Sequence, residues 1–523
     1  MAIRLEPHDP APRLGLARLA AEQGDLGTAR AEARGVMDEA VDQAARARAA
    51  FILGEISRVE GDKASARDCY QAVLKIEDAI LKTNRSDTTA ARWYARARGR
   101  LAELDAAEGA LGSAKTGAEG ALAMLRAAAA AIGEPPVLAA DIADAEMRLG
   151  GLELDDNQPA SARRRLGEAI GRYEALAITE PDEPHWRAAL SDAWALAAEA
   201  DYVRGAHDQA REAMDKALQA RVRLAARDPR EIWALAGTWR IRGALRAALG
   251  DARAAADSLQ QARLLAEQLA AAPCPEAAAR FLVHTMLDQA DHALRTGELN
   301  LAREAADGAR MHAETAARTP LSAAIWLTDV AAGWDRLGEV ARASRALTQA
   351  QEAFSRAVEF RRMASEREPD NATSARGLAA ALVKHGEAAL EAGAFAGARA
   401  SFQESATLRL NMYEAAPEDP RTAQALAVAL ERLGLVALAQ GDKSSARDAW
   451  EDELVLADRI FTDDRDIEAL RFRAIVESHL FGVADPASAE RYRHSALAHF
   501  DELAKAGAMT EREAALRKRL WGG

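Results

Sequence analysis

Small and apolar residues recur along this chain of 523 residues at fixed distances from one another. Ten alanines follow each other at steps of 37, 48, 48, 48, 45, 47, 48, 48 and 48 residues. They are Ala29, Ala66, Ala114, Ala162, Ala210, Ala255, Ala302, Ala350, Ala398 and Ala446. Such self-similarity at a nearly fixed period is the signature of an internal repeat, and the repeat determines the predicted architecture.

Each repeat carries a turn signal five residues before its alanine. The ten turn residues are Gly24, Gly61, Gly109, Asn157, Gly205, Gly250, Gly297, Arg345, Gly393 and Gly441. Glycine and asparagine reach the left-handed backbone region at low cost, and the C-terminus of a helix often needs that conformation. Arg345 lacks this property, so its turn has the weakest support.

The residues on both sides of the turn predict two helices that pack together. Four residues after each alanine stands an apolar residue, and residues four apart share a helix face. These residues are Ala33, Tyr70, Ala118, Leu166, Met214, Leu259, Ala306, Phe354, Phe402 and Trp450. Seven residues before each turn stands Ala or Gly, which lets two helix backbones approach closely. The pattern predicts antiparallel helical hairpins, and no β pattern occurs.

The order of residues in a unit resembles the tetratricopeptide repeat. Around Gly205 the unit reads Trp194, Ala198, the turn glycine, Ala210 and Met214. The resemblance implies an all-α, right-handed α-solenoid of about eleven antiparallel hairpins. The usual tetratricopeptide period is about 34 residues. Most steps here are 48, and the extra residues lengthen each helix by about seven residues, or about two turns.

The repeat phase divides the chain into three regions. Residues 1–43 form a partial repeat and a short hairpin, residues 44–475 an array of long hairpins, and residues 476–523 a degenerate repeat with a capping helix. Residues 3–10 read like the end of a second helix followed by its proline linker. The chain is therefore either the downstream part of a longer protein or begins with a frayed cap, and the sequence favours neither.

Charge and composition exclude several classes of partner. The formal net charge is −13, which argues against general nucleic-acid binding and against docking on anionic membranes. The two cysteines, Cys69 and Cys274, fall in different repeats and imply no disulfide framework. No apolar run of membrane-spanning length without charges and no signal-peptide core is present. We expect a cytoplasmic protein without a membrane partner.

The sequence carries no recognisable motif for catalysis or for cofactor binding. The ten histidines are scattered, without the spacing of a metal site. Residues 109–116 resemble a phosphate-binding loop, but Ala114 replaces the glycine before Lys115 and no strand precedes it. We therefore predict no enzymatic activity, no cofactor and no metal.

The resemblance places the first helix of each hairpin on the inner, concave face of the solenoid. The position six residues before the turn faces that groove and is acidic in six of ten repeats. These candidate partner-binding residues are Glu55, Glu103, Glu199, Asp291, Glu339 and Glu387. Family members that clamp a terminal carboxylate carry Asn there, so that function is disfavoured. An acidic groove favours a basic partner, whereas the alternative is ordinary solvated helix residues.

These observations predict a scaffold for protein–protein interaction that binds a peptide or protein along the concave face. The alternative is a regulatory or recognition region of a larger bacterial signalling protein whose effector domain lies upstream. This alternative rests on the half-repeat at the N-terminus.

Overall fold

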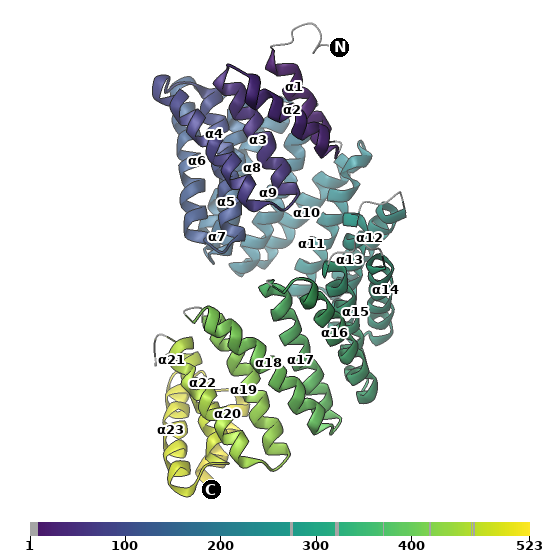
Figure 1. The fold of residues 1–523 in the computed structure, drawn as a ribbon, viewed down its shortest axis with the longest axis vertical. Coiled ribbons are helices and arrows are strands. Elements are labelled where there is room, and N and C mark those ends of the chain that lie inside the picture. Colours follow the sequence, from purple (N-terminus) through teal and green to yellow (C-terminus); the bar gives the residue numbers. More distant parts are fainter. Residues whose placement is uncertain are drawn as a thin grey trace. The chain divides into compact units, whose positions relative to one another are not determined.

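A computed structural model shows an all-α chain (Figure 1). The structure describes residues 9–22, 24–271, 276–318, 324–369, 371–417, 420–461, 463 and 466–522. Throughout these ranges the regular elements are helices, and no strand occurs. Cys274 lies outside the described residues, and Cys69 is half-buried in its helix.

Consecutive helices pair into antiparallel hairpins along the described chain. The pairs are α1 (Pro10–Glu22) with α2 (Leu26–Glu39), α3 (Gln43–Val59) with α4 (Lys63–Thr83), α5 (Thr88–Ala107) with α6 (Leu111–Ile132), α7 (Pro136–Asp155) with α8 (Pro159–Thr179), α9 (Pro184–Val203) with α10 (His207–Ala225), α11 (Ile232–Ala248) with α12 (Ala252–Ala271), α13 (Glu276–Thr296) with α14 (Leu299–Ala317), α15 (Ala324–Ala343) with α16 (Leu347–Arg367), α17 (Ala372–Glu391) with α18 (Phe395–Ala415), α19 (Pro420–Ala439) with α20 (Lys443–Val455), and α22 (Ile467–Phe481) with α23 (Pro486–Lys505). The short helix α21 (Ala457–Ile460) follows α20, and α24 (Glu511–Gly522) ends the chain.

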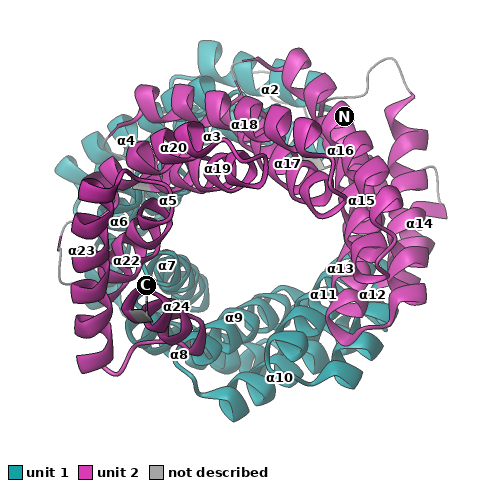
Figure 2. Ribbon diagram, turned by 90° about the horizontal axis from the view of Figure 1, so that it is seen from below, with its two compact units in different colours: residues 1–262 teal, residues 263–523 magenta. Residues whose placement is uncertain are grey.

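The chain forms two compact units, residues 1–262 and residues 263–523 (Figure 2). Within each unit, successive hairpins stack side by side into an arc. The first helices, α3, α5, α7, α9 and α11, lie on the inner side of the first unit, and their partners lie outside. In the second unit α13, α15, α17, α19 and α22 lie on the inner side. We call the surface made by these first helices the inner face.

All ten predicted turn residues have a left-handed backbone. Gly61 has a φ of 81°. The two turn positions without glycine adopt the same left-handed conformation, with φ of 54° at Asn157 and 58° at Arg345. The N–H of the residue after the turn bonds a carbonyl five residues earlier, as from Ala346 to Ala341 at 2.9 Å. This bond caps the last carbonyls of the first helix. The turn at Arg345 therefore forms despite its side chain.

The ten repeat alanines lie in the seams between helices, as predicted. Each has a relative exposure of 0%. Because the methyl group at this position occupies little space, the backbones of neighbouring helices approach closely and exclude water. The close packing gives many small dispersion contacts in place of a few large side chains.

Within each hairpin, the small residue before the turn and the apolar residue after it are matched in size. They stand 16 residues apart, and every glycine faces a large side chain. The glycine pairs are Gly54 with Tyr70, Gly150 with Leu166, Gly243 with Leu259, Gly338 with Phe354, Gly386 with Phe402, and Gly434 with Trp450. Where alanine takes the glycine position, as in Ala102 and Ala290, the partner is another alanine. The exception is Ala198, which is followed by Met214.

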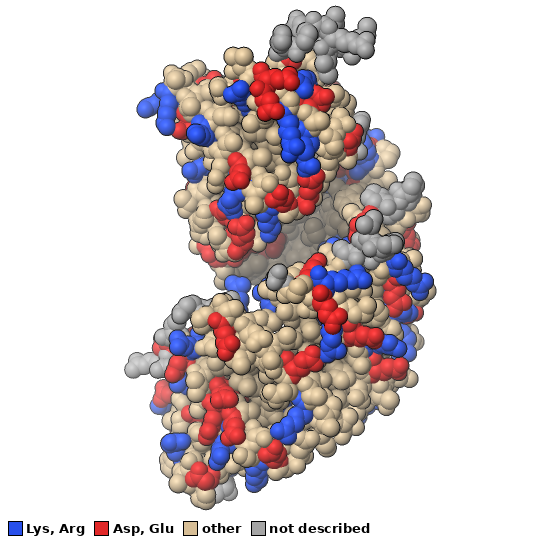
Figure 3. Space-filling view, viewed as in Figure 1, with Lys and Arg blue, Asp and Glu red and all other residues tan. Residues whose placement is uncertain are grey.

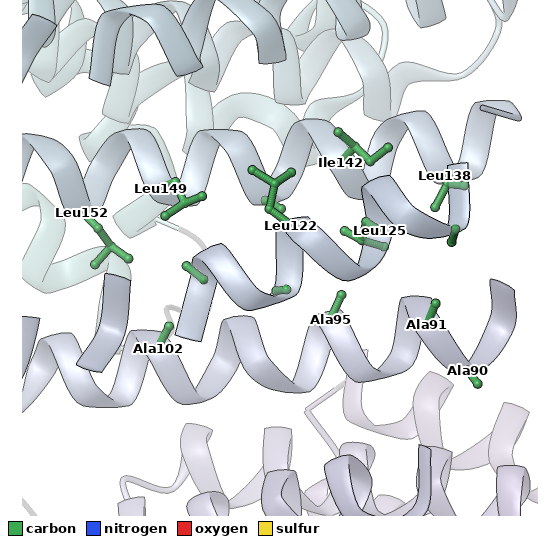
Figure 4. Close-up of a cluster of buried hydrophobic side chains, with 14 of the residues drawn as sticks. Ala90, Ala91, Ala95, Ala102, Leu122, Leu125, Leu138, Ile142, Leu149 and Leu152 are labelled. Atoms are coloured by element: carbon green, nitrogen blue, oxygen red, sulfur yellow. The ribbon is translucent and has the colours of Figure 1, made fainter. Parts of the chain in front are cut away.

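The cores are local and involve neighbouring repeats. In the first unit Leu122 and Leu125 of α6 lie between Ala95 of α5 and leucines of α7 such as Leu149 (Figure 4). All four are at least 95% buried. Contacts of this kind link each repeat to the next, which is how a solenoid is stabilised.

One described helix meets the length and hydropathy criteria for a membrane span, over Arg421–Ala439 in α19. This helix packs against α18 and α20 in the repeat array, and Ala423 and Val436 are fully buried there. Its apolar character is accounted for by the core of the array.

Candidate binding site on the inner face

The six predicted acidic residues all lie on first helices. Glu55 is on α3, Glu103 on α5 and Glu199 on α9 in the first unit. In the second unit they are on α13, α15 and α17, in the order Asp291, Glu339 and Glu387. They do not form one cluster, because each occupies the same place in its own repeat.

Five of these carboxylates pair with a basic side chain of the next repeat, always 45 residues later. The pairs are Glu55 Oε1 with Arg100 Nε at 2.8 Å, Glu103 Oε1 with Arg148 Nε at 3.0 Å, Asp291 Oδ2 with Arg336 Nη2 at 2.8 Å, Glu339 Oε1 with Lys384 Nζ at 3.2 Å, and Glu387 Oε1 with Arg432 Nε at 2.9 Å. We call this series the inter-repeat ladder. Because the partners are half-buried, each pair holds two neighbouring first helices in register.

The ladder contacts change the pKa of Glu103 and of the neighbouring Tyr70. Burial tends to raise the pKa of Glu103, but Arg148 and Arg100 outweigh burial and bring the pKa below its ordinary value. Arg100 also bonds Glu55, which accepts a hydrogen bond of 2.6 Å from the Tyr70 hydroxyl. Burial, together with Glu55, raises the pKa of Tyr70. Each acid of the ladder is therefore paired with a basic side chain of the chain itself.

Glu199 differs from the other five acids. It is exposed, and no ion pair joins it to another residue of the described chain. The step from Gly205 to Gly250 is shorter by three residues, so the residue 45 positions later is Ala244. Ile241 takes the place where other repeats carry the basic partner, and it is 50% exposed. Within the first unit, the ladder therefore joins α3 to α5 and α5 to α7, but it joins neither α7 to α9, where Gly151 takes the acid position, nor α9 to α11.

The sequence contains a signal for the ladder, but the signal appears only when two positions of the repeat are compared with each other. The basic residues stand nine residues before the turn, and the acids six before it. With a period of 48, the two positions differ by 45 residues. Comparison of two columns of the repeat would have paired them.

A second inner-face feature occurs once in each unit at equivalent repeat positions. Asp141 of α7 is buried and binds Arg92 and Arg96 of α5, with Arg96 Nη2 at 3.0 Å. In the second unit Asp329 of α15 is held by Arg280 Nε of α13 at 2.8 Å. The neighbouring His284 completes this second set, with Nε2 at 3.3 Å from Asp329.

The charges around Asp329 also affect its titration. Burial tends to raise the pKa of Asp329, but His284 and Arg280 outweigh burial and lower it. The buried Asp329, held by two basic side chains of the preceding first helix, thus fixes the position of α15 on α13. The equivalent contacts of Asp141 join α7 to α5.

The inner face of the first unit contains a cavity of about 300 Å³. Side chains from α3, α5, α7 and α9 line it, including Phe51, Arg92, Arg96, Asp144 and His185. Asp144 accepts a hydrogen bond from the buried Tyr173 hydroxyl. Burial nevertheless raises the pKa of Asp144. We call this cavity the first-unit pocket; it combines an aromatic ring with groups of both charges.

Charge on the rest of the surface is mixed. On the face seen in Figure 3, Lys and Arg side chains lie among Asp and Glu, without a large area of one sign. Among the described residues no group of three or more His, Cys, Asp or Glu side chains is placed to hold a metal ion. The chemistry available on the inner face is ion pairing, hydrogen bonding and apolar contact.

Comparisons with known proteins give structural likenesses only. No family model and no curated protein matches the chain. Among solved structures, the apo form of RapI is 12% identical, with 77% of this chain and 98% of that chain covered at a TM-score of 0.48. BtubC from P. vanneervenii is 19% identical, with 48% and 91% covered at 0.39. The C-terminal part of a TPR repeat-containing protein from Cytophaga hutchinsonii is 14% identical, with 62% and 98% covered at 0.34.

The helices themselves establish the fold class. The chain is an all-α solenoid of antiparallel hairpins with tetratricopeptide-like order of turn, small and apolar residues, as the sequence predicted. The comparisons do not test the 48-residue period, and the right-handed superhelix stays a prediction. Since fold does not determine function, function is argued from the inner face.

Proposed function

We propose that this chain is a protein-binding scaffold that holds a peptide or protein segment along the inner face. The observation that carries the proposal is the first-unit pocket, to which four successive first helices contribute side chains. Its Phe51 ring offers an apolar anchor, and Arg96 and Asp144 offer groups of opposite charge. Pockets that combine apolar surface with a few polar groups are the usual sites of recognition.

The inter-repeat ladder refines the chemistry of the proposed partner. Glu55, Glu103, Asp291, Glu339 and Glu387 are neutralised by their own partners, so a segment that crosses them meets alternating charges. Glu199 retains an exposed carboxylate, and the exposed Ile241 occupies the position of the basic ladder residue in the next repeat. A basic residue of the partner would bind Glu199, and a neighbouring apolar side chain would cover Ile241.

The other predictions belong to the same proposal. A cytoplasmic location, and a partner that is neither nucleic acid nor membrane, rest on the acidic charge and the cysteine count. The alternative, a recognition region of a larger signalling protein, rests on the half-repeat at residues 3–10, most of which lies outside the described residues. Absence of catalysis is likewise part of the proposal.

Site-specific photo-crosslinking tests the proposed surface. A photoreactive phenylalanine analogue at Ile241, on the inner face, is compared with the same analogue at Val222 of the outer helix α10. Both residues are aliphatic and exposed, at 50% and 43%. We expect one specific protein from a lysate of the source cells to be captured at Ile241 alone. Identical captured proteins at both positions would contradict an inner-face site.

The captured partner then tests the role of charge. Glu199→Gln should weaken binding about twofold to fivefold, the size expected for an exposed ion pair, and should reduce its salt dependence. Asp208→Asn, an exposed acid of α10, is the matched control. Equal effects of the two substitutions would show that only overall charge matters.

A further inference from the structure

The second unit contains a cavity of about 370 Å³ between α19, α20, α21 and α22. Its walls are largely apolar, with Val428, Ile460, Phe461 and Phe472 among them. The rings of Phe461 and Phe472 lie 5.7 Å apart between centroids. Two carboxyl groups, from Glu431 and Glu453, also line it. We call this cavity the Glu453 pocket.

Glu453 breaks the pattern of the repeat. It stands 12 residues after the turn, a position filled in the other nine repeats by small or aliphatic core residues or serine. Those residues are Val36, Val73, Ala121, Ala169, Ala217, Ala262, Ala309, Ala357 and Ser405. Glu453 is therefore the one charged residue among the ten at this repeat position. Such violations concentrate where function requires them.

The helix that carries Glu453 is also irregular. The second helix of the preceding repeat, α18, runs for 21 residues without interruption, whereas α20 ends after 13 residues at Val455. The chain then turns at Leu456 into the short α21. The redirected chain brings Ile460 and Phe461 to the wall of the pocket. The acid and the break in the helix therefore build one site.

The carboxyl group of Glu453 has no partner within the described chain. The residue is 4% exposed, and its Oε2 is fully buried without a hydrogen bond. Burial raises its pKa to about 9, Glu431 acts in the same direction, and Arg432 acts against both. Leaving a polar group buried without a partner is costly. A bound cation would remove that cost.

We propose that the Glu453 pocket binds a small organic cation, an ammonium or guanidinium group carried on an apolar stem. The Glu453 carboxylate accepts hydrogen bonds from the cation, and Glu431 adds a second negative charge. The stem lies against Phe461 and Phe472, whose ring faces also attract cations. The pocket has a volume typical of small-ligand sites. The residues that line this pocket differ from those that line the first-unit pocket.

The other charged groups nearby are already engaged. Arg432 binds Glu387 and Glu431, so only part of its charge acts on Glu453. Arg473 of α22 binds Asp458 of α21 at 2.8 Å. His479 of α22 contacts the Trp450 ring, and burial lowers the pKa of this histidine, which keeps it neutral at pH 7 and above.

Calorimetric titration with benzylguanidinium tests the proposal, with benzylurea as its neutral isostere. The guanidinium keeps its charge throughout the measurable pH range. We expect one benzylguanidinium per chain at pH 8.5, bound at least tenfold more tightly than benzylurea. Glu453→Gln should abolish that preference, whereas Asp452→Asn, the adjacent exposed acid on α20, should preserve it. Thermal melts confirm that both variants are folded.

Three outcomes would overturn the proposal: equal affinity for the two compounds, an unchanged preference in Glu453→Gln, or no binding of benzylguanidinium at millimolar concentration. Titration in two buffers of different ionisation enthalpy adds an independent readout. Binding at pH 7.5 should release close to one proton per cation, and uptake of a proton would contradict the assignment. Acetyl-Gly-Arg-Gly-amide, which lacks an apolar stem, should bind at least tenfold more weakly. Tighter binding of this peptide would overturn the assignment to a free ligand.

Discussion

Gly150 of α7 lies directly under Leu166 of α8. A Cβ atom placed on Gly150 would stand 2.8 Å from Leu166 Cγ, well inside van der Waals contact. The adjacent Gly151 has no heavy atom within 4 Å of the same position. Two neighbouring glycines of one helix therefore have different roles, one allowing close packing and one facing open space.

Alanine substitutions at these two glycines should have opposite effects. Gly150→Ala should lower the free energy of unfolding by about 1–3 kcal/mol, because Leu166 must shift out of a tightly packed seam. Gly151→Ala should raise it by about 0.5–1 kcal/mol, because alanine favours the helix and meets no clash. Denaturant unfolding followed by circular dichroism measures both. Equal effects would show that the seam is loosely packed.

The inter-repeat ladder should contribute a measurable coupling energy. In a double-mutant cycle with Asp291→Asn and Arg336→Gln, we expect a coupling of about 0.5–1 kcal/mol, since the pair is half-exposed. The exchanged pair, Asp291→Arg with Arg336→Asp, should recover most of the stability lost by either reversal alone. Zero coupling would mean that the two residues are positioned by their helices alone.

The turn at Arg345 should improve when glycine replaces the arginine. Its φ of 58° is unfavourable for a side chain with a Cβ, so Arg345→Gly should stabilise the second unit by about 1 kcal/mol. The reverse change at an equivalent turn, Gly393→Ala, should cost a similar amount, since Gly393 has a φ of 75°. Thermal unfolding of the two variants decides the sign. A destabilised Arg345→Gly would indicate a tertiary role for the arginine side chain.

Glu77 should make the first unit less stable as pH rises. It is buried on α4, and burial raises its pKa to about 7, with Arg48 acting against that shift and Asp87 and Asp42 adding to it. Because the folded pKa exceeds the unfolded value of 4.5, the folded state holds the proton more tightly. Its contribution is complete below pH 4.5 and is lost as pH rises to about 7.

Replacement of Glu77 by glutamine should remove this pH dependence. At pH 8 the substitution should raise local stability by about 1–3 kcal/mol, whereas at pH 4.5 it should have little effect. Hydrogen exchange of α4 amides at the two pH values provides the measurement, since it reports on one repeat. Glu119→Gln, an exposed acid of α6, is the control. A benefit at pH 4.5 as large as at pH 8 would rule out titration of Glu77.

The repeat made most of the fold predictable because its packing rules are local. Ala162 and Gly205 could be placed from spacing alone, since a buried methyl and a left-handed turn each demand a particular residue type. The charge of Glu103 is balanced by Arg148 in the following repeat, and the prediction of an acidic groove considered only the repeat position of Glu103. The sequence therefore revealed the acid but not its partner.

The Glu453 pocket lay beyond sequence reasoning for a different reason. Its walls depend on where α20 stops, and Leu456 carries no strong helix-breaking signal. The substitution of an acid for a core alanine was readable from the repeat, but the cavity around it follows from the redirected chain at Phe461. Irregular segments require the three-dimensional structure, whereas the regular ones follow from periodicity.

The constant separation of 45 residues within the ladder bears on how such an array changes its length. A gene duplication that inserts one whole 48-residue copy beside Glu339 and Lys384 would bring an acid for the repeat that follows and a base for the repeat that precedes it. Each of the two new junctions between repeats would then hold an acid and a base at the ladder positions without any further mutation. Lineages could then lengthen or shorten the protein by whole copies without first evolving new side chains at the joints.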